Sequence, residues 1–398
     1  MSEDETNRKL LKPDCHFSHV LRICEDLYQL TENQLEELKR FESYDDQNFF
    51  LKLNVEVGEW ASKQLVLKIT NGVDSRNTAV MESQNKLMLH LRHNSEMVAP
   101  VPLAVTGEGQ ISYYDLPTKG GDCQRLAVRL LEFVPGKALC DVKEVNDNDL
   151  GNAGRLLASF ARAVEGITES EEGYAGFKRT HSWDLQNTLN LGEDRFLGAI
   201  SSESDRALVS KVLDRFNQKI VPLQESLRKS LIMGDLNDAN MIKCKPGEKA
   251  NKTGLALIDF GDTIFSWTVA DIAIAMAYAL LCSKGKALLE QNKPNLQCAL
   301  ALLEGYREAG GPLLPEETEL LHTLMCARLA MSVTYGAYSY ACDPGNEYLL
   351  LHAQPAWASL ERLWAVPEEE FLGLAEAALA KGTPPGEGPY PGGTPLPP

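Results

Sequence analysis

The sequence lacks the features that mark several large classes of protein. Its nine cysteines stand singly, without a C-x-x-C pair, so they indicate neither a disulfide framework nor a zinc site. It contains no G-x-x-x-x-G-K stretch for a P-loop and no H-E-x-x-H for a zinc protease. The apolar run at 269–282 is interrupted by Asp271 and is shorter than the roughly 20 residues of a membrane span. We therefore expect reduced thiols and no membrane helix.

Basic charge is also scarce. The chain has 39 Lys and Arg against 56 Asp and Glu, a formal net charge of -17. This balance disfavours attraction to nucleic-acid phosphates or to an anionic membrane surface. The first residues show no apolar core before a cleavage site and are too acidic for an organelle transit peptide. We therefore predict a cytoplasmic protein without nucleic-acid, membrane or obligate protein partners.

The 398 residues, 44% of them hydrophobic, are enough for two packed lobes. The side chains of residues 64–70 alternate as in a strand, with Leu65, Leu67 and Ile69 on one face. A helical pattern and a second strand follow. This order predicts a small β-rich first lobe over 1–136. The patterns are helical at 17–30, 33–41 and 80–92, and strand-like at 64–70 and 126–134.

From about Asn148 the sequence becomes strongly helical, which predicts a second, mostly helical lobe over 137–380. Within it we expect one hairpin, formed by the strand patterns at 240–244 and 255–260. The tail at 381–398 has 12 Gly or Pro among 18 residues and is predicted to be disordered. The fold class is therefore α+β with two lobes.

Two polar clusters flank this hairpin. The stretch GDLNDAN at 234–240 places Asn240 five residues after Asp235, and IDFGD at 258–262 places Asp259 at the end of the second strand. Phosphoryl transfer needs a carboxylate that accepts the proton of the attacking hydroxyl and ligands for magnesium. Either cluster alone could be a simple turn. Their order and the hairpin between them favour a kinase-like catalytic loop and metal loop.

A nucleotide site would then need a lysine on an earlier strand and a glutamate on the helix after it. Lys68 lies in the alternating strand, and Glu82 opens the next helical segment. Lys68 alone would be interpreted as an exposed strand lysine. The early Glu82 favours an ion pair that fixes its side chain. The stretch LLEFVPG, which includes Glu132, is expected to connect the lobes and to meet a purine edge through backbone groups.

At these residues the sequence resembles the aminoglycoside phosphotransferase-like small-molecule kinases, and within them the hydroxylysine kinase branch. The resemblance covers roughly residues 15–366. SYDDQNFF at 43–50 is the stretch particular to that branch, and the other motifs are VLKI, ESQN, VRLLEFVPGK, WDLQN, GDLNDANMI, LIDFGD and CARLAMSVTYGAYS. It implies the two-lobed protein-kinase-like fold and magnesium-dependent transfer of phosphoryl from GTP to the hydroxyl of 5-hydroxy-L-lysine.

The resemblance also implies roles for single residues. Asp235 would be the catalytic base, Asn240 and Asp259 the magnesium ligands, and Lys68 with Glu82 the phosphate-binding pair. Ser43 would contact phosphates from the loop that covers the nucleotide. That loop contains no glycine, and we expect Asp45 and Asp46 in it to face water or a basic side chain rather than phosphate. Asp271 would brace the catalytic loop, or it is an ordinary first-turn acid of its helix.

For the acceptor, two amines and a carboxylate require acids and one base. Asp262 and Asp184 are candidates for the amine, and Trp183 could stack on the alkyl chain or belong to the core. Arg328 either binds the acceptor carboxylate or forms a salt bridge with a protein acid.

One position departs from the family pattern. The family usually has His before Gly-Asp, where this chain has Met233. This departure slightly favours one alternative, a pseudokinase that binds nucleotide without turnover. The other alternative is a kinase for another amino alcohol, such as homoserine, choline or an aminoglycoside.

Overall fold

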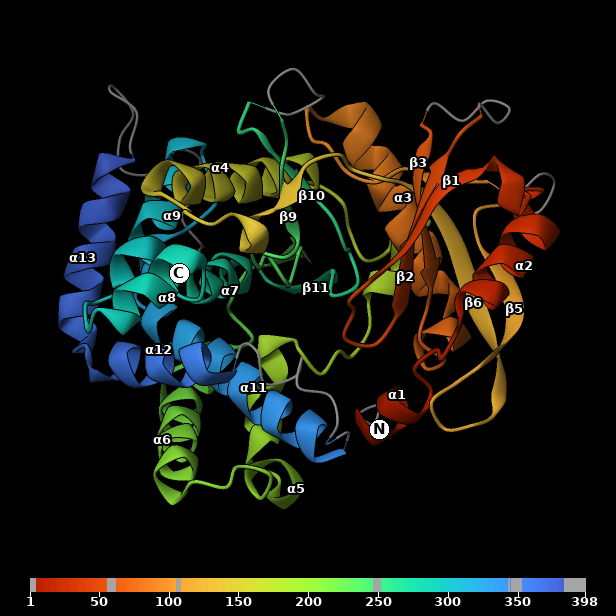
Figure 1. Ribbon diagram of the computed structural model, residues 1–398. Coiled ribbons are helices and arrows are strands. Elements are labelled where there is room, and N and C mark those ends of the chain that lie inside the picture. The colour runs from red at the N-terminus through yellow and green to blue at the C-terminus, as the bar shows by residue number, and fades with distance from the viewer. Residues whose placement is uncertain are drawn as a thin grey trace. The chain divides into compact units, whose positions relative to one another are not determined.

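The computed structural model describes residues 5–55, 62–104, 109–245, 252–342, 344 and 353–382, which form two compact units (Figure 1). Unit 1 comprises Met1–Ser95, Ala99–Pro135 and Glu169–Lys178, and unit 2 comprises Glu96–Val98, Gly136–Thr168 and Arg179–Pro398. The predicted boundary after residue 136 adjoins this division, whereas Glu169–Lys178, which we assigned to the second lobe, belongs to unit 1. The predicted tail lies outside the described residues from 383 onward.

Unit 1 is built on an antiparallel six-stranded sheet. The strand order is β1-β2-β3-β6-β4, and β5 also pairs with β6. The strands are β1 (Leu35–Phe41), β2 (Gln47–Leu53), β3 (Gln64–Ile69), β4 (Pro102–Leu103), β5 (Ser112–Pro117) and β6 (Cys123–Glu132). The predicted strand at 64–70 is confirmed as β3.

Helices cover both faces of this sheet. The apolar residues of β3 face α2 in a buried core, and Asn85 of α3 bonds Arg129 on the opposite face of β6. The helices and short 3-10 turns are α1 (Glu5–Leu10), α2 (Phe17–Tyr28), η1 (Glu32–Gln34), η2 (Asp74–Arg76), α3 (Thr78–Asn94) and η4 (Ala175–Phe177). The alternation of β3 therefore reflects its one face in the apolar core, formed by Leu65, Leu67 and Ile69.

The helix that we predicted at 33–41 is wrong, because Leu35–Phe41 is the edge strand β1. It pairs with β2, and the register shifts between Leu35 and Glu37. This bulge lets Leu35 and Leu38 both pack against the core, so the apolar spacing of three residues imitates a helix.

Unit 2 is mostly helical. Its helices and 3-10 turns are η3 (Leu139–Asp141), α4 (Asp147–Ala163), η5 (Leu185–Gly192), α5 (Asp194–Leu197), α6 (Glu203–Lys219), η6 (Val221–Leu223), α7 (Thr268–Ala279), α8 (Ser283–Glu290), α9 (Leu296–Glu308), α10 (Pro315–Thr318), α11 (Leu321–Cys342), α12 (Ala353–Ala365) and α13 (Glu368–Lys381). Helices α4 and α9 pack closely at Gly154. A Cβ at this position would overlap the carbonyl oxygen of Leu302, so the contact requires glycine.

Short strands in unit 2 frame the polar clusters. The predicted hairpin is confirmed by the antiparallel pairing of β9 (Met241–Lys243) with β10 (Leu255–Leu257), and β7 (Lys137–Ala138) pairs with β9. A second pair, β8 (Lys229–Ile232) with β11 (Ile264–Trp267), was not predicted. Strand β8 leads into Asp235 and β10 leads into Asp259, so both clusters begin where a strand ends.

None of the described helices is long and apolar enough to cross a membrane by itself. Helices α7 and α8 pass that test only as a pair, bent by 51°.

Candidate active site

The loop that carries Asp235 is held through its backbone. The buried carboxylate of Asp271, in the first turn of α7, accepts hydrogen bonds from the N–H groups of Met233 and Gly234, both at 3.0 Å. The prediction that Asp271 braces this loop is confirmed. Burial raises the pKa of Asp271 to about 6, although these two hydrogen bonds oppose the rise. Gly234 has a φ of 78°, and a Cβ there would lie 2.5 Å from the carbonyl oxygen of Asp262.

Both oxygens of the Asp235 carboxylate accept hydrogen bonds. Oδ2 accepts from Nδ2 of Asn237 at 2.8 Å and of Asn240 at 2.9 Å, and Oδ1 accepts from Nη2 of Arg328 at 3.1 Å. Burial raises the pKa of Asp235, whereas Arg328 lowers it. Among the described residues no donor bonds the amide oxygen of Asn240. This amide therefore presents its oxygen while its nitrogen fixes Asp235.

The second cluster follows β10. Asp259 has a φ of 56°, which is uncommon for a residue with a side chain, and its Oδ1 accepts from the N–H of Gly261 at 3.0 Å. Asp262 Oδ1 lies 3.4 Å from Nε2 of His181. Burial, followed by neighbouring carboxylates, raises the pKa of Asp262 to about 7. The Gly261 carbonyl oxygen accepts from Arg179. Neither His181 nor Arg179 stands in a recognisable motif, so the sequence did not indicate them.

Arg328 of α11 lies against Asp235 and two aromatic residues. Its Nη1 donates to the carbonyl oxygen of Trp183 at 2.7 Å, and its Nε donates to the Tyr278 hydroxyl at 3.1 Å. Of the two roles predicted for Arg328, the structure contains the salt bridge to a protein acid, Asp235. The ring of Trp183 packs edge-on against Tyr335, with centroids 5.1 Å apart.

Asp184 is buried and has protein partners for both oxygens. Oδ1 accepts from the N–H of Gln186 at 3.1 Å and from the Ser266 hydroxyl at 2.6 Å, and Oδ2 accepts from the Gln186 amide at 3.0 Å. Asp184 is also the N-cap of η5. The contact of Asp184 with an acceptor amine stays a prediction, and its described contacts are those of a capping residue.

In unit 1, the acids of the loop at 43–46 meet basic side chains. Asp46 Oδ2 lies 2.8 Å from Nζ of Lys68. Asp45 lies 2.7 Å from Nε of Arg8 and 2.9 Å from Nζ of Lys9. We expected Asp45 and Asp46 to face water or a basic side chain, and both face basic side chains.

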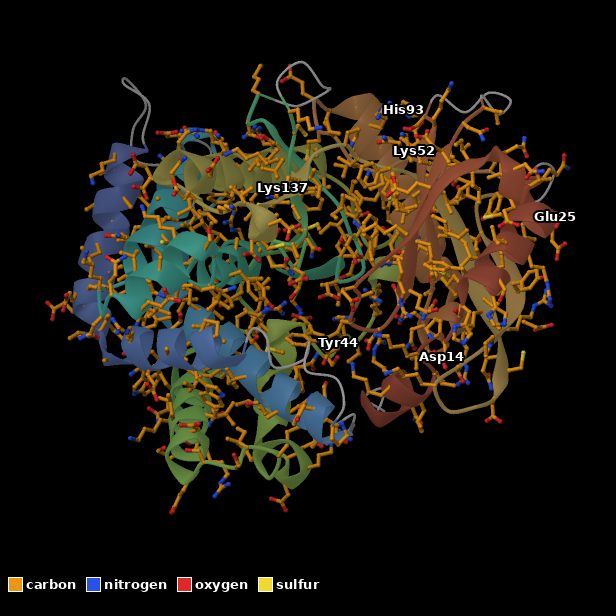
Figure 2. All side chains as sticks on the ribbon, viewed as in Figure 1. Asp14, Glu25, Tyr44, Lys52, His93 and Lys137 are labelled. Carbon is orange, nitrogen blue, oxygen red and sulfur yellow. The ribbon has the colours of Figure 1, made fainter. Side chains whose placement is uncertain are left out.

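The N-terminal segment also holds the backbone of this loop. Lys12 Nζ donates to the carbonyl oxygens of Ser43 at 2.6 Å and Tyr44 at 2.7 Å. Burial lowers the pKa of Lys12 to about 8. Lys9 Nζ lies 3.4 Å from the ring centroid of Tyr44, which is labelled in Figure 2. The segment at 5–12 is thus part of the support of the loop that contains Ser43.

Two further predicted nucleotide residues lie in unit 1. Glu82 is exposed on α3 and lines a cavity of about 350 Å³ together with Lys86 and Tyr113. Glu132 ends β6; its N–H donates to the carbonyl oxygen of Val101 at 2.8 Å. The roles of Glu82 and Glu132 toward a nucleotide stay predictions.

Comparisons with known proteins bear on this arrangement. The family model described as "Phosphotransferase enzyme family" (APH) matches residues 37–310. Hydroxylysine kinase of Mus musculus is 28% identical over 330 residues, which cover 81% of this chain and 83% of that protein.

Solved structures of kinases are similar as well. A microcompartment-associated aminopropanol kinase has a TM-score of 0.63 at 19% identity, covering 90% of this chain and 100% of that one. Amicoumacin kinase hAmiN, in complex with AMP-PNP, Ca2+ and Ami, has a TM-score of 0.58 at 15% identity, covering 89% and 93%. These likenesses confirm the predicted two-lobed, kinase-like α+β fold.

Proposed function

Because the chain belongs to the phosphotransferase enzyme family, we propose that it transfers the γ-phosphoryl group of GTP to the side-chain hydroxyl of 5-hydroxy-L-lysine. The observation that carries this proposal is the Asp235 carboxylate, held by Asn237, Asn240 and Arg328 on a loop that Asp271 braces. The mouse relative named hydroxylysine kinase supports the choice of acceptor.

In the proposed reaction, Asp235 accepts the proton of the acceptor hydroxyl as that oxygen attacks the γ-phosphorus. A bond forms between the acceptor oxygen and phosphorus, the bond from phosphorus to the β,γ-bridging oxygen breaks, and GDP leaves. Three donors fix the two oxygens of Asp235, so its orientation is set before the acceptor binds. Such preorganisation is the main contribution that a protein makes to phosphoryl transfer.

Asn240 and Asp259 would hold magnesium. The Asn240 amide oxygen is the atom suited to a metal, since the amide nitrogen is bonded to Asp235. Asp259 is kept in a left-handed conformation, a strain that often accompanies a functional position. Within the described part of the chain, no group of three His, Cys, Asp or Glu side chains forms a metal site. Magnesium in kinases uses one or two protein ligands together with phosphate oxygens, whose charge it neutralises.

For the nucleotide, we assign the phosphates to Lys68. Lys68 stands on β3, and its ammonium forms an ion pair with Asp46 of the loop at 43–46. Ser43 and the backbone of its loop would add contacts to phosphate, and Glu82 and Glu132 keep their predicted roles. GTP as the donor rests on the family resemblance.

For the acceptor, Asp262 is the residue that we assign to an ammonium group. It is a partly exposed carboxylate close to Asp235, and its protein partner His181 lies 3.4 Å away. Trp183 has an aromatic face that could pack on the alkyl chain, as predicted.

The first experiment is magnesium-dependent GTP turnover by the purified protein, with 5-hydroxy-L-lysine, homoserine, choline and an aminoglycoside in parallel, and with ATP as the second donor. We expect GDP release to be stimulated by hydroxylysine and abolished in Asp235→Asn. Asp214→Asn is the matched control. It makes the same chemical change in an exposed carboxylate of α6, and it is expected to retain most of the turnover.

Stimulation by another acceptor alone would replace hydroxylysine with that amino alcohol. No stimulation by any acceptor, in protein whose melting temperature rises with GTP and magnesium, would instead favour the pseudokinase.

A further inference from the structure

Arg328 is buried in the middle of α11, with a side chain only 1% exposed. A guanidinium group removed from water needs partners for its N–H groups and its charge. Here each of its three nitrogens donates to a different residue: Nε to Tyr278, Nη1 to the Trp183 carbonyl and Nη2 to Asp235. Its central carbon also lies 5.0 Å from the Trp183 ring centroid and 5.1 Å from that of Tyr278. The group is therefore fixed in position and in orientation.

We propose that Arg328 is a positioning residue, which holds the Asp235 carboxylate in its orientation, and that it is not the ligand of the acceptor carboxylate. This inference rests on the proposed function, in which Asp235 is the base. Arg328 binds Oδ1, while Asn237 and Asn240 bind Oδ2. Two amides hold one oxygen of the carboxylate and one guanidinium group holds the other, so the carboxylate cannot rotate freely.

Arg328 is the cation bonded to Asp235 within a group of charged and polar residues. Near Asp235 also lie Tyr278 from α7, Asp259 and Asp262 after β10, and Asp238 in its own loop, and Arg179 and His181 lie near Asp262. The hydrogen bond from Nη2 fixes Oδ1 on the side opposite to the two amides that fix Oδ2.

The two roles of Arg328 predict different kinetics. A ligand of the acceptor carboxylate would act only on acceptors that have one, and its loss would raise their KM. A positioning residue acts on the base, so its loss lowers kcat for every acceptor. The diamine 1,5-diaminopentan-2-ol has the chain, amines and hydroxyl of hydroxylysine without the carboxylate, and is therefore the comparison acceptor.

The test compares Arg328→Lys and Arg328→Gln with the unmodified protein on both acceptors. We expect kcat to fall by about 10- to 100-fold for both acceptors, with KM within about threefold. The fall should be smaller in Arg328→Lys, which keeps a positively charged donor. A rise in KM confined to hydroxylysine, with kcat unchanged for both acceptors, would overturn the proposal.

Tyr278→Phe keeps the test decisive if both Arg328 variants fail to fold. It removes one hydrogen bond to Nε without touching Asp235, and we expect kcat to fall about threefold for both acceptors. An unchanged kcat in this variant would count against the proposal.

A second measurement does not depend on turnover. Calorimetry gives the affinity of hydroxylysine for the protein saturated with a non-hydrolysable GTP analogue and magnesium. This affinity should stay within about threefold in Arg328→Gln if Arg328 does not bind the acceptor carboxylate. An affinity weaker by about tenfold or more would refute the positioning role, whereas absent turnover in the unmodified protein would refute only the proposed function.

Discussion

Replacing Gly234 with alanine should damage both the stability and the activity of this protein. Gly234 has a φ of 78°, and the new Cβ would lie 2.5 Å from the carbonyl oxygen of Asp262. Real Cβ contacts stay beyond 3.0 Å and are ordinary beyond 3.4 Å, so the two segments must separate by 0.5 to 0.9 Å (3.0 or 3.4 minus 2.5). One of these segments leads directly into Asp235, and the other contains Asp262.

The expected loss in the free energy of unfolding has two parts. An alanine in the left-handed region costs about 1 kcal/mol relative to glycine, and an overpacked contact costs roughly 1–3 kcal/mol. Gly254→Ala is the matched control, because Gly254 has a φ of 70° and no atom within 4 Å of its Cβ position. We expect urea denaturation to give a loss of about 2–4 kcal/mol in the free energy of unfolding for Gly234→Ala and about 1 kcal/mol for Gly254→Ala.

Turnover should separate the two variants further. A displacement approaching 1 Å between groups that act together can cost up to about 100-fold in rate. We therefore expect hydroxylysine-dependent GDP release to fall by about 10- to 100-fold in Gly234→Ala and to be nearly unchanged in Gly254→Ala. Equal losses of stability in the two variants, or full turnover in Gly234→Ala, would refute the close approach of the Gly234 loop to Asp262.

Two further predictions concern the acceptor and the helical packing of unit 2. Burial raises the pKa of Asp262 to about 7, and only its ionised form attracts an ammonium group. The KM for hydroxylysine should therefore rise as pH falls below 7, and steady-state kinetics should show this pH dependence lost in Asp262→Asn. Gly154→Ala should lower the free energy of unfolding by about 1–3 kcal/mol, because its Cβ would overlap the Leu302 carbonyl. Gly373→Ala in α13, which meets no atom within 4 Å, should raise it by roughly 0.5–1 kcal/mol, and urea denaturation would check both.

The features that could be predicted from the sequence are those with a local cause. The alternation of β3 follows from the single face that it turns to the apolar core, and the hairpin of β9 and β10 follows from two apolar runs around a polar turn. The brace by Asp271 was also predictable, since the resemblance placed an Asp at the start of that helix. Strands β8 and β11 were not, because each has only four residues and the pairing joins segments more than 30 residues apart.

Strand β1 shows how a local pattern can mislead. Its residues LEELKRF are good helix formers, and Leu35 and Leu38 stand three apart as on a helix face. In the structure the bulge at Glu36 and Glu37 brings both leucines to the core side of an edge strand, while the charged residues between them face water. A bulge depends on the partner strand β2, so the sequence of β1 alone could not indicate it.

The partners of charged side chains were the least predictable part of the site. Arg328 and Asp235 are 93 positions apart in the sequence, and Asp46 meets Lys68 from the loop before β2. The sequence indicated that a buried arginine needs a counter-charge, but only the tertiary fold decides which acid supplies it. The same limit applies to His181, whose contact with Asp262 joins two loops.

The structure also bears on the histidine that the family pattern places at Met233. The brace of the loop that carries Asp235 runs through the backbone N–H groups of Met233 and Gly234, so the side chain at 233 takes no part in the hydrogen bonds to Asp271. That side chain is fully buried, and a methionine has no polar group there that requires a partner. An imidazole at this depth would bring two ring nitrogens that both need one. The substitution is therefore compatible with an intact loop, and the choice between kinase and pseudokinase rests on the carboxylate chemistry of Asp235 rather than on residue 233.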